Sequence, residues 1–429
     1  MKKLIAASLV MCMLYACKKN DPPPNTIPPV TSKSPSITSV SPITGGYNTV
    51  ITITGTNFST AITNNHVTVN GVVAAIQSAT NTTITALVPE RAGTGNVVVT
   101  TDDGTSNGTI FTYVPNVFVV GGELKGNMIE AKYWKNDVPT ILSDHSRVND
   151  IFVSGNDVYA CGFERDTISG RNTPIYWKNG IGNTLPITST SSGSAESIFI
   201  VGNDVYVAGG ELTSSLTSVA SYWKNGVLTT LSDSTNSIHA AYSIFVSGND
   251  TYVVGNKFNS VGGFGASNTT GKFWKNGIET PLTNTPNFIS SANSVFVSGN
   301  DVYIAGSESS GSTSTAKYWK NNVEIRLNSI NSGRATDIFV SGNDVYVVGD
   351  EYVGGGKNAI VYWKNGNKII VTDGSISSYA NSIQVNGNDV YVSGYELGVI
   401  SPVMYWKNGT KITLTDGTNS TYTGSLFLQ

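Results

Sequence analysis

Tryptophan occurs in a single sequence context in this 429-residue chain. All 7 tryptophans begin the triplet Trp-Lys-Asn, and successive triplets are separated by 43, 46, 51, 45, 44 and 43 residues. Self-similarity at such a period indicates a repeat architecture in which each unit is one supersecondary element. The copies begin at Trp134, Trp177, Trp223, Trp274, Trp319, Trp363 and Trp406. We therefore expect an array of similar units from about Val117 to the end of the chain.

One copy shows the secondary structure expected of every unit. The residues between its strands favour tight hairpin turns, because Gly and Asn tolerate a positive φ. These turns are Gly202-Asn203-Asp204 and Asn225-Gly226. The expected strands are Ser197–Val201, Val205–Gly209, Ser221–Lys224 and Val227–Leu231. Four antiparallel strands in a repeat of about 45 residues are typical of a β-propeller blade.

The two ends of the repeat region predict how the propeller closes. The first unit starts at Val117–Gly121, which matches a second strand, so its opening strand is missing. Ser425–Gln429 at the C-terminus matches a first strand. We therefore predict an all-β fold in which residues 116–429 form a seven-bladed propeller with three-plus-one strand closure.

The repeat resembles known propeller families only distantly. The pairs Gly121-Gly122 and Gly209-Gly210, followed later by Tyr and Trp, are similar to kelch repeats. The Trp-Lys-Asn that ends a third strand is similar to the Trp-Asp of WD40 repeats, but the Asp and its partner His are missing. The unit most resembles uncharacterised propeller repeats of secreted bacterial proteins, and this resemblance implies no activity.

Residues 35–114 have a different pattern, in which short alternating runs are separated by Gly, Asn and Pro. Period-two runs with frequent turn signals favour an antiparallel sandwich. The run Gly55-Thr56-Asn57-Phe58 and the later Val69-Asn70-Gly71 and Ile84–Pro89 resemble the IPT/TIG family of immunoglobulin-like domains. The resemblance implies a spacer or interaction module, and nothing in these residues suggests chemistry.

The first residues predict export and a lipid anchor. Lys2 and Lys3 precede an uncharged apolar stretch that is too short to span a bilayer and suits a signal peptide covering residues 1–16. Leu14–Cys17 resembles the lipobox of bacterial lipoproteins, which implies that Cys17 carries the lipid, including palmitate, and contacts the membrane. The alternative is an ordinary cleaved signal peptide that contains a Cys. Residues 17–34 include Pro22, Pro23 and Pro24 and are expected to be an extended spacer. The cell envelope, at the outer membrane and its surface, is the expected location.

Composition excludes several classes of function. Charged residues are 13% of the chain and the net charge is −3, whereas nucleic-acid binding needs clustered Lys and Arg. With 3 Cys and 3 His, we expect no disulfide framework, no metal and no cofactor. Strand closure is expected to stabilise the ring instead, in a monomer.

Candidate ligand-binding residues lie on the propeller face that carries the variable loops. Binding residues concentrate on loops that a rigid scaffold positions. An acid recurs after the second strand, Lys257 replaces it in one blade, and two arginines occur in one loop only. These residues are Glu123, Glu164, Arg165, Arg171, Glu211, Lys257, Glu308, Glu351 and Glu396. The alternative is that each Glu only accepts hydrogen bonds within its own blade. The long loop Asn259–Thr270 is a candidate flap.

No catalytic residues are predicted. His145 and His239 lie on the candidate face but two blades apart, and no nucleophile or phosphate-loop motif is present. We expect a surface-anchored, non-catalytic binding or adhesion protein that presents a propeller face to a glycan or protein. The alternatives are an exported carbohydrate-active enzyme, such as a polysaccharide lyase or glycoside hydrolase, and a structural subunit of a cell-envelope complex. The tryptophans are expected to pack between blades rather than to bind sugar.

Overall fold

The computed structural model describes residues 33–126, 128–188, 192–212, 217–232, 237–259, 269–282, 289–329, 331–398 and 400–429. In these ranges the regular structure is β-strand apart from one short 3-10 helix, η1 (Ile62–Asn64). No helix in the described ranges is long and apolar enough to cross a membrane. The predicted signal peptide, Cys17, the spacer as far as residue 32 and most of the candidate flap lie outside the described residues.

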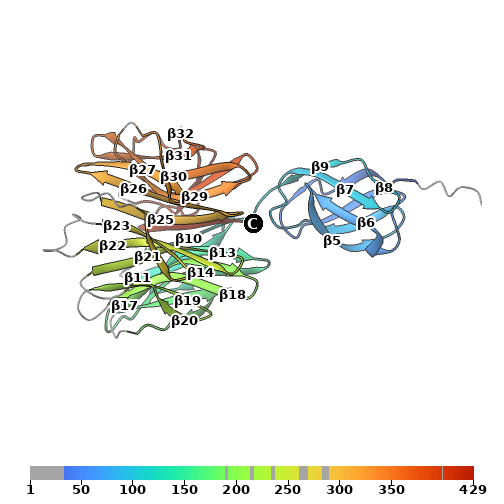
Figure 1. The fold of residues 1–429 in the computed structure, drawn as a ribbon. Coiled ribbons are helices and arrows are strands. Elements are labelled where there is room, and N and C mark those ends of the chain that lie inside the picture. Colours follow the sequence, from blue (N-terminus) through green and yellow to red (C-terminus); the bar gives the residue numbers. More distant parts are fainter. Residues whose placement is uncertain are drawn as a thin grey trace, which may run out of the picture.

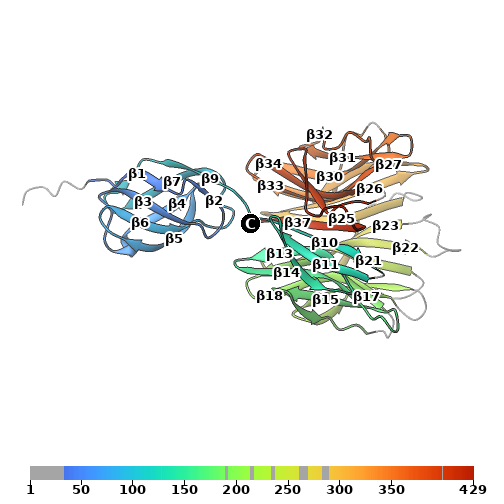
Figure 2. The same cartoon turned by 180° about the vertical axis from the view of Figure 1, so that it is seen from behind.

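The N-terminal part is a β-sandwich (Figures 1 and 2). One side follows the order β1-β3-β6-β5, the other contains β4-β7-β9, and their buried side chains meet in one core that includes Ile51, Ile84 and Phe111. The strands are β1 (Ser36–Ser41), β2 (Thr44–Gly45), β3 (Val50–Thr56), β4 (His66–Val69), β5 (Val72–Ala79), β6 (Thr83–Leu87), β7 (Gly95–Thr101), β8 (Gly104–Thr105) and β9 (Thr109–Tyr113). The alternation in β3, where Ile51 and Ile53 are buried and Val50 and Thr56 are exposed, is what the sequence pattern predicts.

The rest of the chain forms seven blades of four antiparallel strands, as predicted. Each blade is given below from the channel outward. Blade 1 consists of β37 (Thr421–Leu428), β10 (Val117–Lys125), β11 (Met128–Lys135) and β12 (Val138–Ser143); blade 2 of β13 (Ser146–Ser154), β14 (Asp157–Arg165), β15 (Asn172–Lys178) and β16 (Ile181–Thr184); blade 3 of β17 (Ser192–Val201), β18 (Asp204–Leu212), β19 (Ser218–Lys224) and β20 (Val227–Thr230); blade 4 of β21 (Ser237–Ser247), β22 (Asp250–Asn259), β23 (Thr269–Lys275) and β24 (Ile278–Pro281); blade 5 of β25 (Ile289–Ser298), β26 (Asp301–Ser310), β27 (Thr313–Lys320) and β28 (Val323–Arg326); blade 6 of β29 (Gly333–Ser341), β30 (Asp344–Gly354), β31 (Lys357–Lys364) and β32 (Asn367–Ile370); and blade 7 of β33 (Ser378–Asn386), β34 (Asp389–Glu396), β35 (Met404–Lys407) and β36 (Thr410–Thr413).

The ring closes through its first blade. Strand β37 pairs antiparallel with β10, from Val117 opposite Leu428 to Glu123 opposite Thr421. The three-plus-one closure predicted from the ends of the chain is therefore confirmed. The C-terminus lies between the two domains (Figure 1), where Asn116 and Gln429 exchange two backbone hydrogen bonds of 2.7 and 3.0 Å.

The tryptophan of each triplet packs between adjacent blades. Trp223 is fully buried against Tyr159, Cys161 and Leu185 of the preceding blade. Its Nε1 donates a hydrogen bond of 2.7 Å to the carbonyl of Pro186. A buried indole with its N–H satisfied is a structural residue, so the packing role expected from the sequence holds for this side chain.

The Lys and Asn of the triplet join the two hairpin turns of a blade. Asn225 has φ 49° in the turn between β19 and β20, and its Nδ2 donates a 2.8 Å bond to Asp204 in the other turn. Lys224 pairs with the same carboxylate at 2.9 Å and lies over the ring of Tyr206. The same ion pair, at 2.7–2.9 Å, is present in six blades: Lys178–Asp157, Lys224–Asp204, Lys275–Asp250, Lys320–Asp301, Lys364–Asp344 and Lys407–Asp389. Each lysine and its aspartate are therefore used within the repeat.

The sandwich contacts the propeller face that carries these tight turns. Asn48 donates a 2.8 Å hydrogen bond to Asn156, and the guanidinium of Arg91 lies 4.7 Å from the ring centre of Phe427. The first strands place a phenylalanine in the channel in six blades, and Gln384 takes this place in the seventh. Arg91 and Gln384 line the same part of the channel, at its end next to the sandwich. The sandwich therefore covers this end, and the loop-rich end faces away from it.

Candidate functional site

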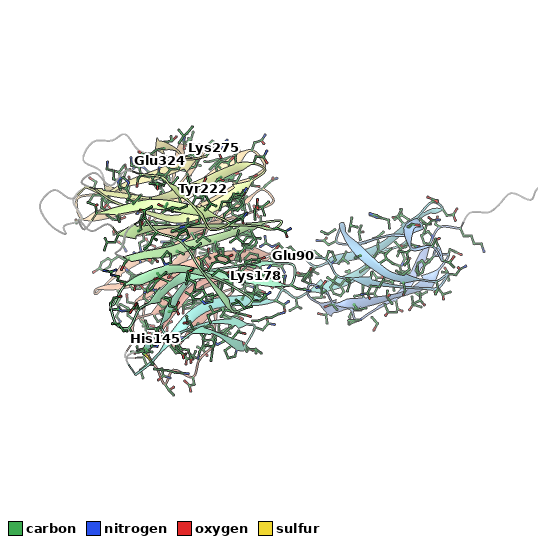
Figure 3. All side chains as sticks on the ribbon, turned by 90° about the horizontal axis from the view of Figure 1, so that it is seen from below. Glu90, His145, Lys178, Tyr222, Lys275 and Glu324 are labelled. Atoms are coloured by element: carbon green, nitrogen blue, oxygen red, sulfur yellow. The ribbon has the colours of Figure 1, made fainter. Side chains whose placement is uncertain are left out.

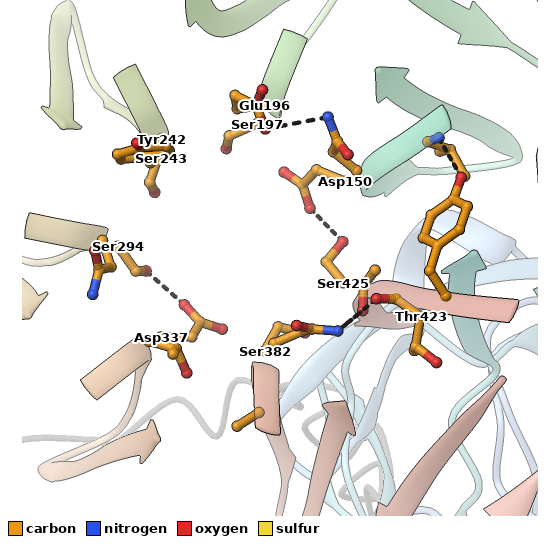
Figure 4. A pocket seen from close by; sticks show the side chains of 18 of the residues that line it. Asp150, Glu196, Ser197, Tyr242, Ser243, Ser294, Asp337, Ser382, Thr423 and Ser425 are labelled. Carbon is orange, nitrogen blue, oxygen red and sulfur yellow. Dashed lines mark hydrogen bonds between the residues drawn. The ribbon is translucent and has the colours of Figure 1, made fainter. Parts of the chain in front are cut away.

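A belt of hydrogen bonds surrounds the channel and connects neighbouring blades. Its members stand two residues before the channel phenylalanine or Gln384 in each first strand: Ser425, Asp150, Ser197, Ser243, Ser294, Asp337 and Ser382. Asp150, for example, accepts bonds of 2.5 Å from Ser425 and 2.9 Å from the Ile198 amide, which belong to the blades on either side. Figure 4 shows the belt from close by. The same position thus serves blade assembly all around the ring.

Two belt members are carboxylates where the other five are serines. Burial raises the pKa of Asp337 to about 6, although Ser294 and the amides of Ile338 and Ile383 donate hydrogen bonds to it. Burial also raises the pKa of Asp150. Desolvation disfavours the charged form of a carboxyl group, and here this effect on the pKa is larger than the opposite effect of the hydrogen-bond donors. The belt therefore contains two acids that ionise less readily than exposed carboxyl groups.

A funnel of about 530 Å³ opens on the belt from the loop-rich side. One residue before each belt position, the sequence is less regular, with Asn in three blades and a different residue in each of the other four. These lining residues are Gly424, Asn149, Glu196, Tyr242, Asn293, Thr336 and Asn381. Asn149 donates hydrogen bonds to the Ala195 carbonyl at 2.9 Å and to Glu196 at 3.2 Å. Contacts between neighbouring blades therefore also orient side chains that line the funnel. Burial raises the pKa of Glu196 and raises the pKa of Tyr242 to about 12.

Arginine and tyrosine pairs form one part of the funnel rim. Arg147 lies over Tyr422 with its guanidinium 4.7 Å from the ring centre, and the Tyr422 hydroxyl accepts a 2.7 Å bond from the Val148 amide. Arg334 lies over Tyr379 at 5.4 Å. Tyr379 in turn stacks on Tyr395, with ring centres 5.2 Å apart.

A second hollow of about 480 Å³ adjoins the funnel at Arg334. It extends outward along blade 6 and is lined by Asp350, Tyr352, Asn358 and Tyr379 among others. The Nε of Arg334 donates to both oxygens of Asp350, at 2.9 and 3.0 Å, which fixes the guanidinium between the two hollows. Together they provide a polar and aromatic surface suited to hydroxyl-rich ligands.

The acids predicted from the sequence lie on the expected face but outside the funnel lining. Glu211 accepts hydrogen bonds of 2.7 and 2.5 Å from the amide and hydroxyl of Thr188, and Glu164 accepts one of 3.4 Å from Ser143. The other four form ion pairs within their own blades: Glu123 with Lys132, Glu308 with Lys317, Glu351 with Lys368 and Glu396 with Lys411. Four of these contacts stay within one blade, as the structural alternative supposes, whereas Glu164 bonds to Ser143 of the preceding blade and Glu211 to Thr188 in the loop that joins two blades.

The basic residues and histidines singled out in the sequence also lie apart from the funnel. Arg165 and Arg171 are exposed at the two ends of the loop between β14 and β15. Lys257 and His239 face each other across β21 and β22, and His239 is buried. His145 lies on the side of the propeller opposite Lys178 and the sandwich (Figure 3). In the described ranges, no group of three or more His, Cys, Asp or Glu is placed to hold a metal ion.

The funnel residues could have been found from the sequence by aligning the first strands. In that alignment the position two before the phenylalanine is Ser except for Asp150 and Asp337, and the next position upstream is Asn in three copies and a different residue in each of the other four. Recurrent residues attract attention in a repeat protein, but the residues that break the repeat line the funnel.

Comparison with known proteins identifies the N-terminal domain. Residues 35–113 match the model of the IPT/TIG domain family, which confirms the resemblance read from the sequence. No curated protein is detectably similar to the chain.

Several solved structures match the chain at low similarity. A protein of unknown function from Bacteroides thetaiotaomicron is 13% identical over 84% of this chain and 95% of its own, with a TM-score of 0.46. An auxiliary nutrient binding protein from the same organism is 12% identical over 85% of this chain and 96% of its own, with a TM-score of 0.34. An ulvan lyase from a new polysaccharide lyase family is 10% identical over 71% of this chain and 93% of its own, with a TM-score of 0.44. Similarity at this level carries no conclusion about function.

Proposed function

We propose that the chain is a surface-anchored, non-catalytic binding protein whose propeller funnel binds a glycan. The observation that carries the proposal is the funnel lining. A scaffold of near-identical blades presents amide, hydroxyl, carboxyl and tyrosine side chains at one concave site, with Asn in three blades and a different residue in each of the other four. Such a convergent set on a regular scaffold is the usual form of a ligand site.

The chemistry of the lining favours a sugar over an apolar ligand. Asn149, Asn293 and Asn381 supply amides that donate and accept hydrogen bonds, and Tyr242 and Tyr422 add aromatic rings that carry a hydroxyl group. A sugar ring has the matching combination of hydroxyl groups and apolar C–H faces. A protein loop that enters the funnel is the competing ligand.

The order of segments supports a role at the cell envelope. In this proposal the lipid on Cys17 anchors a monomer in the outer membrane, and the proline-rich segment and the sandwich hold the propeller away from the bilayer. Two or more acyl chains on one cysteine are enough for stable anchoring. Substitution Cys17→Ala should abolish palmitate labelling and release the protein from the membrane fraction. Retention of both the label and membrane association would contradict the anchor.

A glycan array with the purified full-length chain tests the binding function. We expect binding to at least one glycan class, lost on Tyr242→Ala and on Asn149→Ala. Asn183→Ala on β16, at the outer edge of its blade, is the matched control and should bind normally. Absence of glycan binding, or binding that both funnel variants retain, would refute the proposal.

The second candidate function is an exported polysaccharide lyase or glycoside hydrolase. It is favoured by Glu196, which lies in the funnel beside Tyr242 and Asp150 and whose pKa burial raises. A carboxyl group with a raised pKa suits general acid catalysis. Release of new reducing ends or unsaturated products from a bound polysaccharide, abolished by Glu196→Gln, would establish the enzyme in place of the binding protein.

A further inference from the structure

The funnel rim is not symmetric, and its asymmetry is chemical. Five residues before the channel phenylalanine or Gln384, four consecutive blades carry large side chains: Arg334, Tyr379, Tyr422 and Arg147. The other three blades carry Ser194, Ala240 and Ser291 at the same position. Blades 6, 7, 1 and 2 therefore form a continuous Arg-Tyr-Tyr-Arg wall that blades 3, 4 and 5 lack.

Each arginine of the wall is held in place by an aromatic ring. Arg147 lies over Tyr422 and Arg334 over Tyr379, so the pairing order is mirrored about the junction of blades 7 and 1. Stacking on an aromatic ring restrains the guanidinium plane and leaves its edge accessible to a ligand. The half-exposed Arg334 uses only Nε in its bonds to Asp350, and no other described residue bonds to its Nη1 or Nη2.

The funnel carboxylates form no ion pair with these two arginines, although Glu196 interacts electrostatically with Arg147, and Asp350, outside the funnel, pairs with Arg334. Asp150 and Asp337 accept hydrogen bonds within the belt, which lies below the rim. Glu196 accepts bonds of 2.6 Å from Ser194 and 3.2 Å from Asn149. Among the described residues, Arg147 forms no ion pair. The rim thus presents guanidinium groups above a hydroxyl-rich and amide-rich funnel.

On the basis of the proposed function, we propose that the ligand is an anionic glycan whose carboxylate or sulfate groups bind Arg147 and Arg334. Guanidinium groups match these anions in charge and, through paired N–H donors, in geometry. The sugar hydroxyl groups bind the amides and serines below the rim. Because Arg334 also lines the outer hollow with Tyr352 and Asn358, the bound chain extends from the funnel outward over blade 6.

Affinity electrophoresis and calorimetry with the full-length chain test this assignment on three probes. Polygalacturonate supplies carboxylates, dextran sulfate supplies sulfates, and dextran is neutral. We expect binding to one or both anionic probes, at least about tenfold tighter than to dextran. Arg147→Gln should weaken it by about tenfold to a hundredfold, the usual effect of losing a charged hydrogen bond.

Two further variants separate a specific site from general charge and from misfolding. Arg326→Gln removes the same charge from an exposed outer strand, where Arg326 pairs with Glu324, and should bind like the parent. Arg334→Gln is made together with Asp350→Asn, so that no buried carboxylate is left unpaired, and should bind as weakly as Arg147→Gln.

The possible outcomes distinguish this inference from the function on which it rests. Neutral glycans that bind as tightly as anionic ones, or binding that is unchanged in Arg147→Gln, would overturn the anionic assignment while the glycan-binding function stands. An equal loss in Arg326→Gln would also overturn it, because attraction would then be nonspecific. Failure to bind any glycan, neutral or anionic, would refute the proposed function as well.

Discussion

Replacing Asp337 by serine should make the protein more stable at neutral pH. Five of the seven blades already carry serine at this belt position, so the side chain fits there. Serine can still accept the bond from the Ile383 amide, as Ser382 accepts one of 2.8 Å from the Leu426 amide. The substitution removes a carboxyl group whose ionisation in the folded protein is unfavourable.

The magnitude follows from the pKa of the folded and unfolded states. Burial raises the pKa of Asp337 from 3.8 to about 6, and each pKa unit corresponds to about 1.4 kcal/mol. Above pH 7 the folded state therefore loses about 3 kcal/mol to this ionisation. Asp337 also accepts bonds from Ser294 and Ile338. The two acceptor lone pairs of a serine hydroxyl can keep the Ile383 and Ser294 bonds, so the loss is that of the Ile338 bond and costs about 1 kcal/mol. We expect a net gain of about 2 kcal/mol at pH 7.5.

The pH dependence has a definite sign. An acid with a raised pKa in the folded state stabilises that state below its unfolded pKa, and this contribution is lost as pH rises from about 4 to about 6. The advantage of Asp337→Ser should therefore disappear near pH 4, where the lost Ile338 bond makes the variant less stable by up to about 1 kcal/mol, and reach its full size above pH 7. Denaturant unfolding of both proteins across this range measures the difference.

A control in the same blade should show the opposite sign. Hydrogen bonds from Lys364 and Asn365 lower the pKa of the exposed Asp344, so Asp344→Ser should lose stability at neutral pH and recover as pH falls. If Asp337→Ser were no more stable than the parent at pH 7.5, or if its difference from the parent did not change with pH, the reasoning from burial would be refuted.

Three further predictions address the scaffold. Deleting residues 421–429 removes the strand that closes the first blade, so it should expose sheet edges, lower the thermal midpoint and cause aggregation in sedimentation experiments; an unchanged midpoint would contradict the closure argument. Trp363→Ala should cost about 3–5 kcal/mol in denaturant unfolding, because it empties a fully buried site and leaves the Asn328 carbonyl without its indole donor; a cost below about 1 kcal/mol would contradict packing as its main role. Arg91→Ala should weaken docking of the sandwich by about 1–2 kcal/mol through loss of the contact with Phe427, seen as faster proteolysis at Val114–Asn116; an unchanged cleavage rate would count against it.

Much of the fold could be predicted from the sequence because each blade is specified locally. The triplet Trp-Lys-Asn marks a hairpin in every copy, since Asn adopts a positive φ there and its side chain bonds to the neighbouring turn. The number of blades and the closing strand follow from counting these local units. The IPT/TIG domain was recognisable for the same reason, because its core alternation and turn residues are continuous in the chain.

The candidate site was harder to predict because it is assembled around an axis. Recurrence drew attention to Glu308, but this acid forms an ion pair with Lys317 inside its own blade. Arg165 and Arg171 break the repeat, yet they lie in an exposed loop away from the funnel. Arg147 and Arg334 break it at a position that faces the ring axis, but they are nearly 190 residues apart in the chain.

By itself the sequence determined the repeat, the turns, the closure and the order of the domains, because these depend on residues close together in the chain or on its two ends. Only the tertiary structure decided which edge of each blade lines the channel and which side chains of the first strand point into it. Successive side chains of a strand alternate between faces, so the lining depends on radial packing and not on local pattern. That packing brings Arg147, Glu196, Tyr242 and Arg334, from four different blades, to one funnel.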